Sequence, residues 1–325
     1  MPLRRRSLLA GVVATGLTAV NALAQGAWPD RPIRFVVPYT AGGGTDTVTR
    51  HIAEKITQDT RWAFVVDNKP GAGGNIGLDL VAKAKPDGYT IGMGQTSNLA
   101  INPVAMPKMP FDPAKDIVPV ALVAEVPTVL VVRADSPLKS LADLLQAAKA
   151  KPGQMTQALA GTGTVGHLAG EMLARKAGVK FLSVPYKGAA PALTDLLGGQ
   201  TDFMFATPQA ILGMLQGGKL RALAVTSAKR IDALRGVPTV AEQGFKDFEA
   251  VDWKVIVTPA GTPAEVVKRL NAATARALAQ PALIAKLAEE GSSPMSGSPE
   301  EVVRYIKAEQ AEWGALIREA GIRFD

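Results

Sequence analysis

A glycine-rich loop between a strand and a helix is the feature that most constrains the fold of this chain. An apolar run at 33–37 leads into residues 38–46 (PYTAGGGTD), and Val48, Ile52 and Ile56 then recur at the spacing of an amphipathic helix. Glycines let a backbone turn its N–H groups inward, and the first amides of a helix carry partial positive charge. Such a loop suits a phosphate or a carboxylate, although a tight turn that binds nothing has the same pattern.

The same arrangement recurs along the chain. Glycine loops follow apolar runs at residues 71–77 and 160–166, and a further loop follows the run at 181–184. Strands that alternate with helices predict a mostly parallel, doubly wound α/β sheet. Long apolar stretches at 118–132 and 251–257 are interpreted as crossings between two such lobes. We therefore expect a first, discontinuous lobe of residues 27–128 plus 252–325, and a second lobe of residues 129–251.

The N-terminus has the pattern of an export signal. Residues 1–24 combine three arginines, an apolar stretch and a small-x-small cleavage site before Gln25. The ordinary secretion route is favoured over the twin-arginine route, which residues 5–9 (RRSLL) resemble. The net charge of +7 falls to +4 without the three signal arginines, and no basic run remains, so nucleic-acid binding is unsupported. We expect a soluble periplasmic protein that has no cysteine and acts as a monomer.

Several chemistries are disfavoured by their missing residues. Gly161, Gly163 and Gly166 match the dinucleotide fingerprint, but the next strand ends without the acid that should bind the ribose. No glycine loop continues into the lysine of a nucleotide-triphosphate loop, and no nucleophile elbow occurs. With two histidines and no cysteine, no metal site or cofactor is expected.

Individual polar residues leave alternatives open. His51 is interpreted as structural, whereas His167, in the first turn after a glycine loop, could face a ligand or pack and cap the helix. Asp46 is interpreted as favouring a positive helix start more than acting as a base. Lys187 could pair with an acidic ligand or point to solvent. An exported, two-lobed chain with anion cradles in both lobes and no catalytic constellation indicates a solute-binding protein rather than an enzyme.

Motifs along essentially the whole mature chain resemble the Bug-type receptors of the tripartite tricarboxylate transporter family. They are residues 28–33 (WPDRPI), 38–46 (PYTAGGGTD), 67–74 (DNKPGAGG), 86–89 (PDGY), 167–169 (HLA), 184–188 (VPYKG), 220–226 (LRALAVT) and 259–263 (PAGTP). The resemblance implies a type II periplasmic-binding-protein fold and a small di- or tricarboxylate, amino acid or aromatic acid held between the lobes. The substrate-binding residues it implies are Tyr39, Thr40, Gly43, Gly44, Asn75, Gln95, Thr96, Gly163, Thr164, His167, Tyr186 and Lys187.

Two departures from the family pattern bear on the ligand. Leu159 stands where the strand before the third loop usually ends in a small hydroxyl residue, which favours a ligand less polar than a hydroxy-tricarboxylate. The usual glycine after Trp253 is replaced, since Lys254 and Val255 follow. The implied partner is the membrane permease of a tripartite tricarboxylate transporter. A sensor that passes its closed state to a signalling protein is the alternative.

Overall fold

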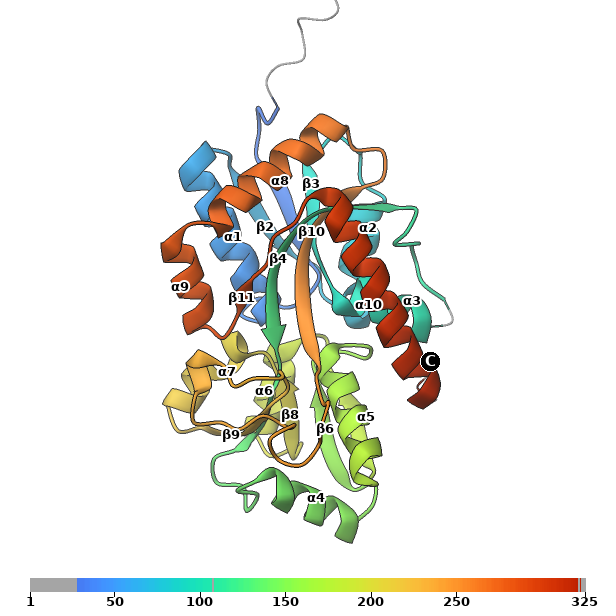
Figure 1. Ribbon diagram of the computed structural model, residues 1–325, viewed down its shortest axis with the longest axis vertical. Coiled ribbons are helices and arrows are strands. Elements are labelled where there is room, and N and C mark those ends of the chain that lie inside the picture. The colour runs from blue at the N-terminus through green and yellow to red at the C-terminus, as the bar shows by residue number, and fades with distance from the viewer. Residues whose placement is uncertain (1–27, 107, 321, 323–325) are drawn as a thin grey trace, which may run out of the picture.

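The computed structural model describes residues 28–106, 108–320 and 322; the predicted signal segment, residues 1–24, lies outside them. Two sheets form two lobes, stacked along the long axis of the molecule (Figure 1). We call the six-stranded sheet with the helices packed on it the first lobe, and the five-stranded sheet with its helices the second. The α/β class and the two lobes around a cleft agree with the sequence.

The first lobe has strand order β11-β4-β10-β3-β1-β2. Its strands are β1 (Ile33–Val37), β2 (Phe64–Asn68), β3 (Thr90–Gln95), β4 (Ile117–Pro127), β10 (Val251–Pro259) and β11 (Ser293–Pro294). Its helices are α1 (Gly44–Thr60), η1 (Ala72–Gly74), α2 (Asn75–Ala82), η2 (Ser97–Ile101), α3 (Asn102–Ala105), α8 (Ala264–Leu278), α9 (Pro281–Glu289) and α10 (Pro299–Ala320). Val48, Ile52 and Ile56, the predicted apolar stripe of α1, are buried.

The second lobe has strand order β7-β6-β8-β5-β9. Its strands are β5 (Val129–Arg133), β6 (Met155–Leu159), β7 (Phe181–Pro185), β8 (Phe203–Ala206) and β9 (Leu220–Val225). Its helices are α4 (Leu141–Ala150), α5 (Val165–Ala177), α6 (Ala189–Leu197), α7 (Pro208–Gln216) and the short η3 (Asp232–Leu234).

The prediction of mostly parallel sheets is wrong, because both sheets are mixed. β10 runs antiparallel to β3 and β4, and β5 runs antiparallel to β8 and β9. The reason is the route of the chain between lobes: β4 and β5 carry it out of the first lobe, and β10 carries it back in the opposite direction. The predicted crossing at 118–132 divides at Thr128, whose N–H donates to Thr226 Oγ1 at 2.9 Å. The two crossings lie side by side, since Val251 pairs with Pro127.

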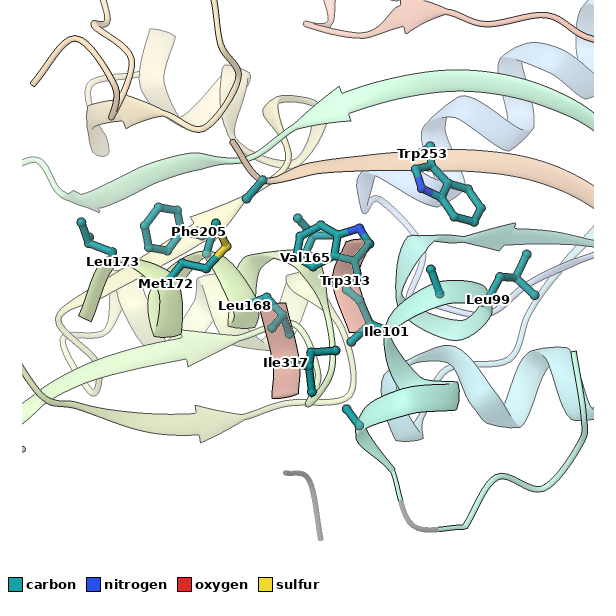
Figure 2. Packing of buried hydrophobic residues seen from close by; sticks show 14 of the residues in the cluster. Leu99, Ile101, Val165, Leu168, Met172, Leu173, Phe205, Trp253, Trp313 and Ile317 are labelled. Atoms are coloured by element: carbon teal, nitrogen blue, oxygen red, sulfur yellow. The ribbon is translucent and has the colours of Figure 1, made fainter. Parts of the chain in front are cut away.

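The two lobes contact each other through the C-terminal helix, α10. An apolar cluster joins them through the C-terminal helix: Trp313 and Ile317 of α10 belong to the same buried cluster as Val165 and Leu168 of α5 (Figure 2). The Arg175 guanidinium of α5 also donates to the carbonyl of Glu319. The structure is therefore a closed arrangement of the two lobes.

Candidate functional site

A small cavity lies where the two sheets face each other. Its volume is about 60 Å³, which is room for a small molecule or a few waters rather than a polymer. The lining comes from both lobes: Tyr39, Gly43, Gly44, Thr45, Gln95, Thr128, Ala160, Thr164, Val165, Gly166, Ala189, Met204, Phe205, Ala206, Thr207 and Asp252.

Helix starts from both lobes surround this cavity. Helix α1 begins at Gly44, and its N-cap, Gly43, has an extended backbone with no side-chain cap. Helix α6 begins at Ala189, and its N-cap residue is also a glycine, so no side chain caps this helix start. The first amides of an α-helix have no intrahelical partner and carry the positive end of the helix dipole. These amides therefore give the cavity the electrostatics of an anion site.

Helix α5 presents its amides somewhat differently. The Thr164 hydroxyl accepts from the His167 N–H at 3.4 Å, so one of the first amides is capped from within. The Gly163 N–H donates to His167 Nδ1 at 3.2 Å, which fixes that nitrogen as an acceptor. Val165 and Gly166, the first two residues of the helix, line the cavity. At the start of α5 the backbone of Val165 and Gly166, rather than that of Gly163, therefore adjoins the cavity.

Asp46 braces the glycine loop of the first lobe. Its carboxylate, 3% exposed, accepts from the Gly42 N–H, the Arg50 guanidinium and the Asn68 amide, each at 3.0 Å. Burial alone would raise the pKa of this carboxyl, but the bonds from these three partners lower it. Asp46 does not line the cavity, so its position fits the helix-start interpretation and not the role of a base.

Five of the twelve residues implied by the sequence line the cavity. They are Tyr39, Gly43, Gly44, Gln95 and Thr164. The Tyr39 hydroxyl donates to the Gly73 carbonyl at 2.7 Å, and burial raises the pKa of Tyr39, so this side chain stays neutral at physiological pH. Gln95 Oε1 accepts from the Thr45 hydroxyl at 2.6 Å. Their contact with a ligand stays a prediction.

Three others belong to the first lobe but lie outside the lining of the cavity: Asn75 and Thr96 are buried, and Thr40 is half-buried. Asn75 accepts from the Asn102 amide at 3.0 Å, and Thr96 accepts from the Trp253 N–H at 2.9 Å. Thr40 meets the second lobe at Gly188, where an added Cβ would lie 2.2 Å from its hydroxyl.

The remaining four belong to the second lobe and do not line the cavity either. Gly163 and His167 bond to each other within their loop. The Tyr186 hydroxyl donates to Asp195 at 2.7 Å, and burial together with this carboxylate raises the pKa of Tyr186 to about 12. Lys187 is exposed. His51, interpreted as structural, pairs with Glu290 at 2.8 Å, far from the cavity lining.

Sequence reasoning missed part of the lining. Residues 204–207 come at the carboxyl end of β8, where strand ends gather in such sheets, and that position could have indicated them. No sequence signal indicated Asp252, because a single acidic residue before a tryptophan matches no known motif. Leu159, from which a less polar ligand was inferred, is buried but does not line the cavity.

The described residues contain neither a metal-binding cluster nor a helix that could span a membrane. No group of three or more histidine or acidic side chains there could hold a metal ion. None of the helices in that part of the chain has the length and apolar character needed to cross a membrane.

The fold and this cavity define the class of the protein: a two-lobed binding protein of the type II periplasmic-binding-protein fold. Residues 48–322 match the model of the tripartite tricarboxylate transporter family receptor, and the chain belongs to that family, which is one of receptors and not of enzymes. Relatives include a protein from the tcbD-tcbE intergenic region of Pseudomonas sp. strain P51, 41% identical over 97% of this chain and 94% of its own. BugT of Bordetella pertussis is 36% identical over 91% of each chain.

Solved structures agree with this assignment. The periplasmic binding protein BugD superposes with a TM-score of 0.87 at 36% identity, over 91% of this chain and 99% of its own. The R. palustris protein Rpa4515 with adipate has a TM-score of 0.88 at 38% identity, over 91% and 99%. MatC from Rhodopseudomonas palustris with bound malate has a TM-score of 0.84 at 31% identity, over 89% and 100%.

Proposed function

We propose that this protein is a periplasmic receptor that captures a small carboxylate between its two lobes and delivers it to the permease of a tripartite tricarboxylate-type transporter. One observation carries the proposal: helix N-termini from both lobes meet at a single cavity. Only the closed arrangement brings both sets of amides to one ligand, which couples capture to closure. The adipate and malate held by two related structures are carboxylates of suitable size.

In this proposal the charge of the ligand is held by backbone amides. The principal donors are the amides at the start of α1, around Gly44 and Thr45, and the amides of Val165 and Gly166 at the start of α5. Fixed amides donate to a carboxylate without the ordering of a long side chain. Lys187 is exposed and plays a secondary part.

Two adjacent alanines at the start of α6 test whether the ligand is an anion. Ala189 lines the cavity, whereas Ala190 is exposed and does not. An acid is favourable near the start of a helix, so both Ala189→Asp and Ala190→Asp should fold. We expect Ala189→Asp to abolish carboxylate binding through charge repulsion and Ala190→Asp to leave it nearly unchanged. Lys187→Met should weaken binding by about 1 kcal/mol or less, as for a screened surface charge.

Calorimetric titration with a panel of small carboxylates measures these effects, and native mass spectrometry of the purified protein identifies any ligand it retains. Tighter carboxylate binding by Ala189→Asp would contradict an anion site. Loss of binding in Lys187→Met alone would make the lysine the anchor. Delivery is tested separately, with membrane vesicles that contain the permease: uptake of the carboxylate should depend on added receptor. Uptake that is equal without the receptor would contradict the transport role.

A further inference from the structure

A buried ion pair forms part of the cavity wall. Asp252 is the second residue of β10, and Lys254 is two residues further along the same strand. Asp252 is 4% exposed and Lys254 is fully buried. Lys254 Nζ bonds to Asp252 Oδ2 and lies 3.1 Å from Gln95 Oε1. Both acceptors of the lysine are therefore protein side chains. Asp252 and Gln95 line the cavity, whereas Lys254 does not.

The second carboxylate oxygen of Asp252 is left without a partner. Oδ1 is buried and makes no hydrogen bond to any described residue. A buried acceptor that has lost its water and gained no donor is unfavourable, because its desolvation is not compensated. Since Asp252 lines the cavity, a molecule bound there is in a position to supply the missing donor.

We infer that the ligand carries a hydroxyl or an ammonium group on its carbon chain and donates it to Asp252 Oδ1. This inference rests on the proposed function, because it takes the carboxylate to be held by the helix starts and adds a second point of recognition. Asp252 is then the residue that distinguishes substituted acids from plain ones.

The charge of Asp252 is compatible with an acidic ligand because Lys254 offsets it. An unpaired carboxylate in the wall would repel the ligand carboxylate held a few ångströms away. Because Asp252 is paired with Lys254, the two side chains together carry almost no net charge, while Asp252 Oδ1 remains a strong acceptor. A plain dicarboxylate can occupy such a cavity, but it leaves Oδ1 unsatisfied.

Matched acids that differ by one donor test the inference. We propose calorimetric titration with malate against succinate, aspartate against succinate, and lactate against propionate. The protein should bind at least one substituted acid about tenfold more tightly than its plain counterpart. This difference of about 1.4 kcal/mol is within the range expected when a buried acceptor gains its donor. Equal affinities within every pair would overturn the inference.

Asp252→Asn is the decisive variant. Lys254 needs an acceptor, so the amide oxygen should turn toward Nζ and place the amide NH₂ where Oδ1 stood. A donor then faces the donor of the ligand, and the preference for the substituted acid should fall to about threefold or less. Asp135→Asn is the matched control, because Asp135 pairs with Arg133 two residues away but is exposed and outside the cavity. It should keep the tenfold preference.

A second variant serves if Asp252→Asn fails to fold by circular dichroism. Asp252→Val with Lys254→Met replaces the whole pair by apolar side chains, which buried ion pairs often tolerate. It should bind succinate at least as tightly as malate. Retention of the tenfold preference in either folded variant would overturn the inference while carboxylate binding itself stands. If the unaltered protein binds no acid of the panel, the proposed function fails, and this inference with it.

Discussion

At the scale of single residues, the glycine loop beside the cavity is held by Asp46, a side chain outside the cavity lining. The Asp46 carboxylate, in the first turn of α1, accepts hydrogen bonds from Gly42, Arg50 and Asn68. Its negative charge also lies at the positive end of that helix. Asp46 therefore ties the glycine loop to the start of α1 and to the end of β2 by charge-assisted hydrogen bonds.

We predict that Asp46→Asn lowers the free energy of unfolding at pH 7 by about 2 kcal/mol, because bonds to a charged acceptor are replaced by weaker neutral ones. The folded state lowers the pKa of Asp46 below its ordinary value of 3.8. The carboxylate thus contributes stability above pH 3.8, and that contribution is lost as the pH falls below it.

Urea titrations from pH 7 down to pH 3 measure this difference. The gap between the unaltered protein and Asp46→Asn should narrow steadily below about pH 4. Glu54→Gln, an exposed acid-to-amide change on the same helix, is the control and should have little effect. A gap that stays constant over the whole range would mean that the charge of Asp46 contributes nothing.

At the scale of elements, α10 joins the two lobes. Its side chains Trp313 and Ile317 are buried in a cluster that also contains Leu168 of α5 (Figure 2). Helix α10 belongs to the first lobe, so opening the cleft must separate these apolar contacts. The helix therefore favours the closed arrangement without touching the ligand.

Ile317→Ala should cost about 2–5 kcal/mol of stability, as expected for a buried isoleucine. It should also weaken ligand binding, by about tenfold for each 1.4 kcal/mol lost by the closed arrangement relative to the open one. Ile284→Ala on α9, at a side chain that is 38% exposed, is the matched control. Thermal unfolding and calorimetric titration measure both effects. Unchanged affinity in a destabilised Ile317→Ala would show that α10 supports the fold alone.

Local elements could be predicted from the sequence better than their pairing. The stripe of Val48, Ile52 and Ile56 is buried as predicted, because it depends on periodicity within one segment. Strand direction in the two mixed sheets could not be predicted, since it depends on the route of the chain between lobes. The surroundings of Lys254 were hidden for a similar reason: its acceptor Gln95 comes from β3, a strand far away in the sequence.

At the scale of the whole molecule, closure brings backbone against backbone. An added Cβ at Gly73 would lie 2.4 Å from the Thr162 carbonyl of the other lobe. At Gly44 it would lie 2.9 Å from Thr207 Cβ, an atom that no side-chain rotation can move away. Glycine at position 44 thus serves the closed arrangement, whereas glycine at position 73 also suits a left-handed backbone (φ +61°).

We predict that Gly44→Ala separates folding from binding. Alanine is favoured over glycine within a helix by up to about 1 kcal/mol, so the variant should fold. Its methyl group should hinder closure and weaken carboxylate binding by about tenfold, since overpacking against Thr207 costs about 1–3 kcal/mol. Gly213→Ala on α7, where an added Cβ meets nothing within 4 Å, is the control.

Small-angle scattering with a saturating carboxylate measures closure. The radius of gyration should be larger for Gly44→Ala than for the unaltered protein and for Gly213→Ala. A Gly44→Ala protein that is as compact and binds as tightly as the unaltered one would contradict the closed arrangement as the binding form.

The helix starts around the cavity also affect how such a receptor can change in evolution. Peptide N–H groups are present whatever side chain a residue carries, except at proline, so the hold on a negative charge does not depend on the identity of most wall residues. Substitutions at positions such as 128, 160, 205 and 252 can then alter the length or the substituents of the acid that fits, while its carboxylate is still retained. The ligand specificity of such a receptor can therefore change from one acid to another through intermediate variants that each still bind a carboxylate.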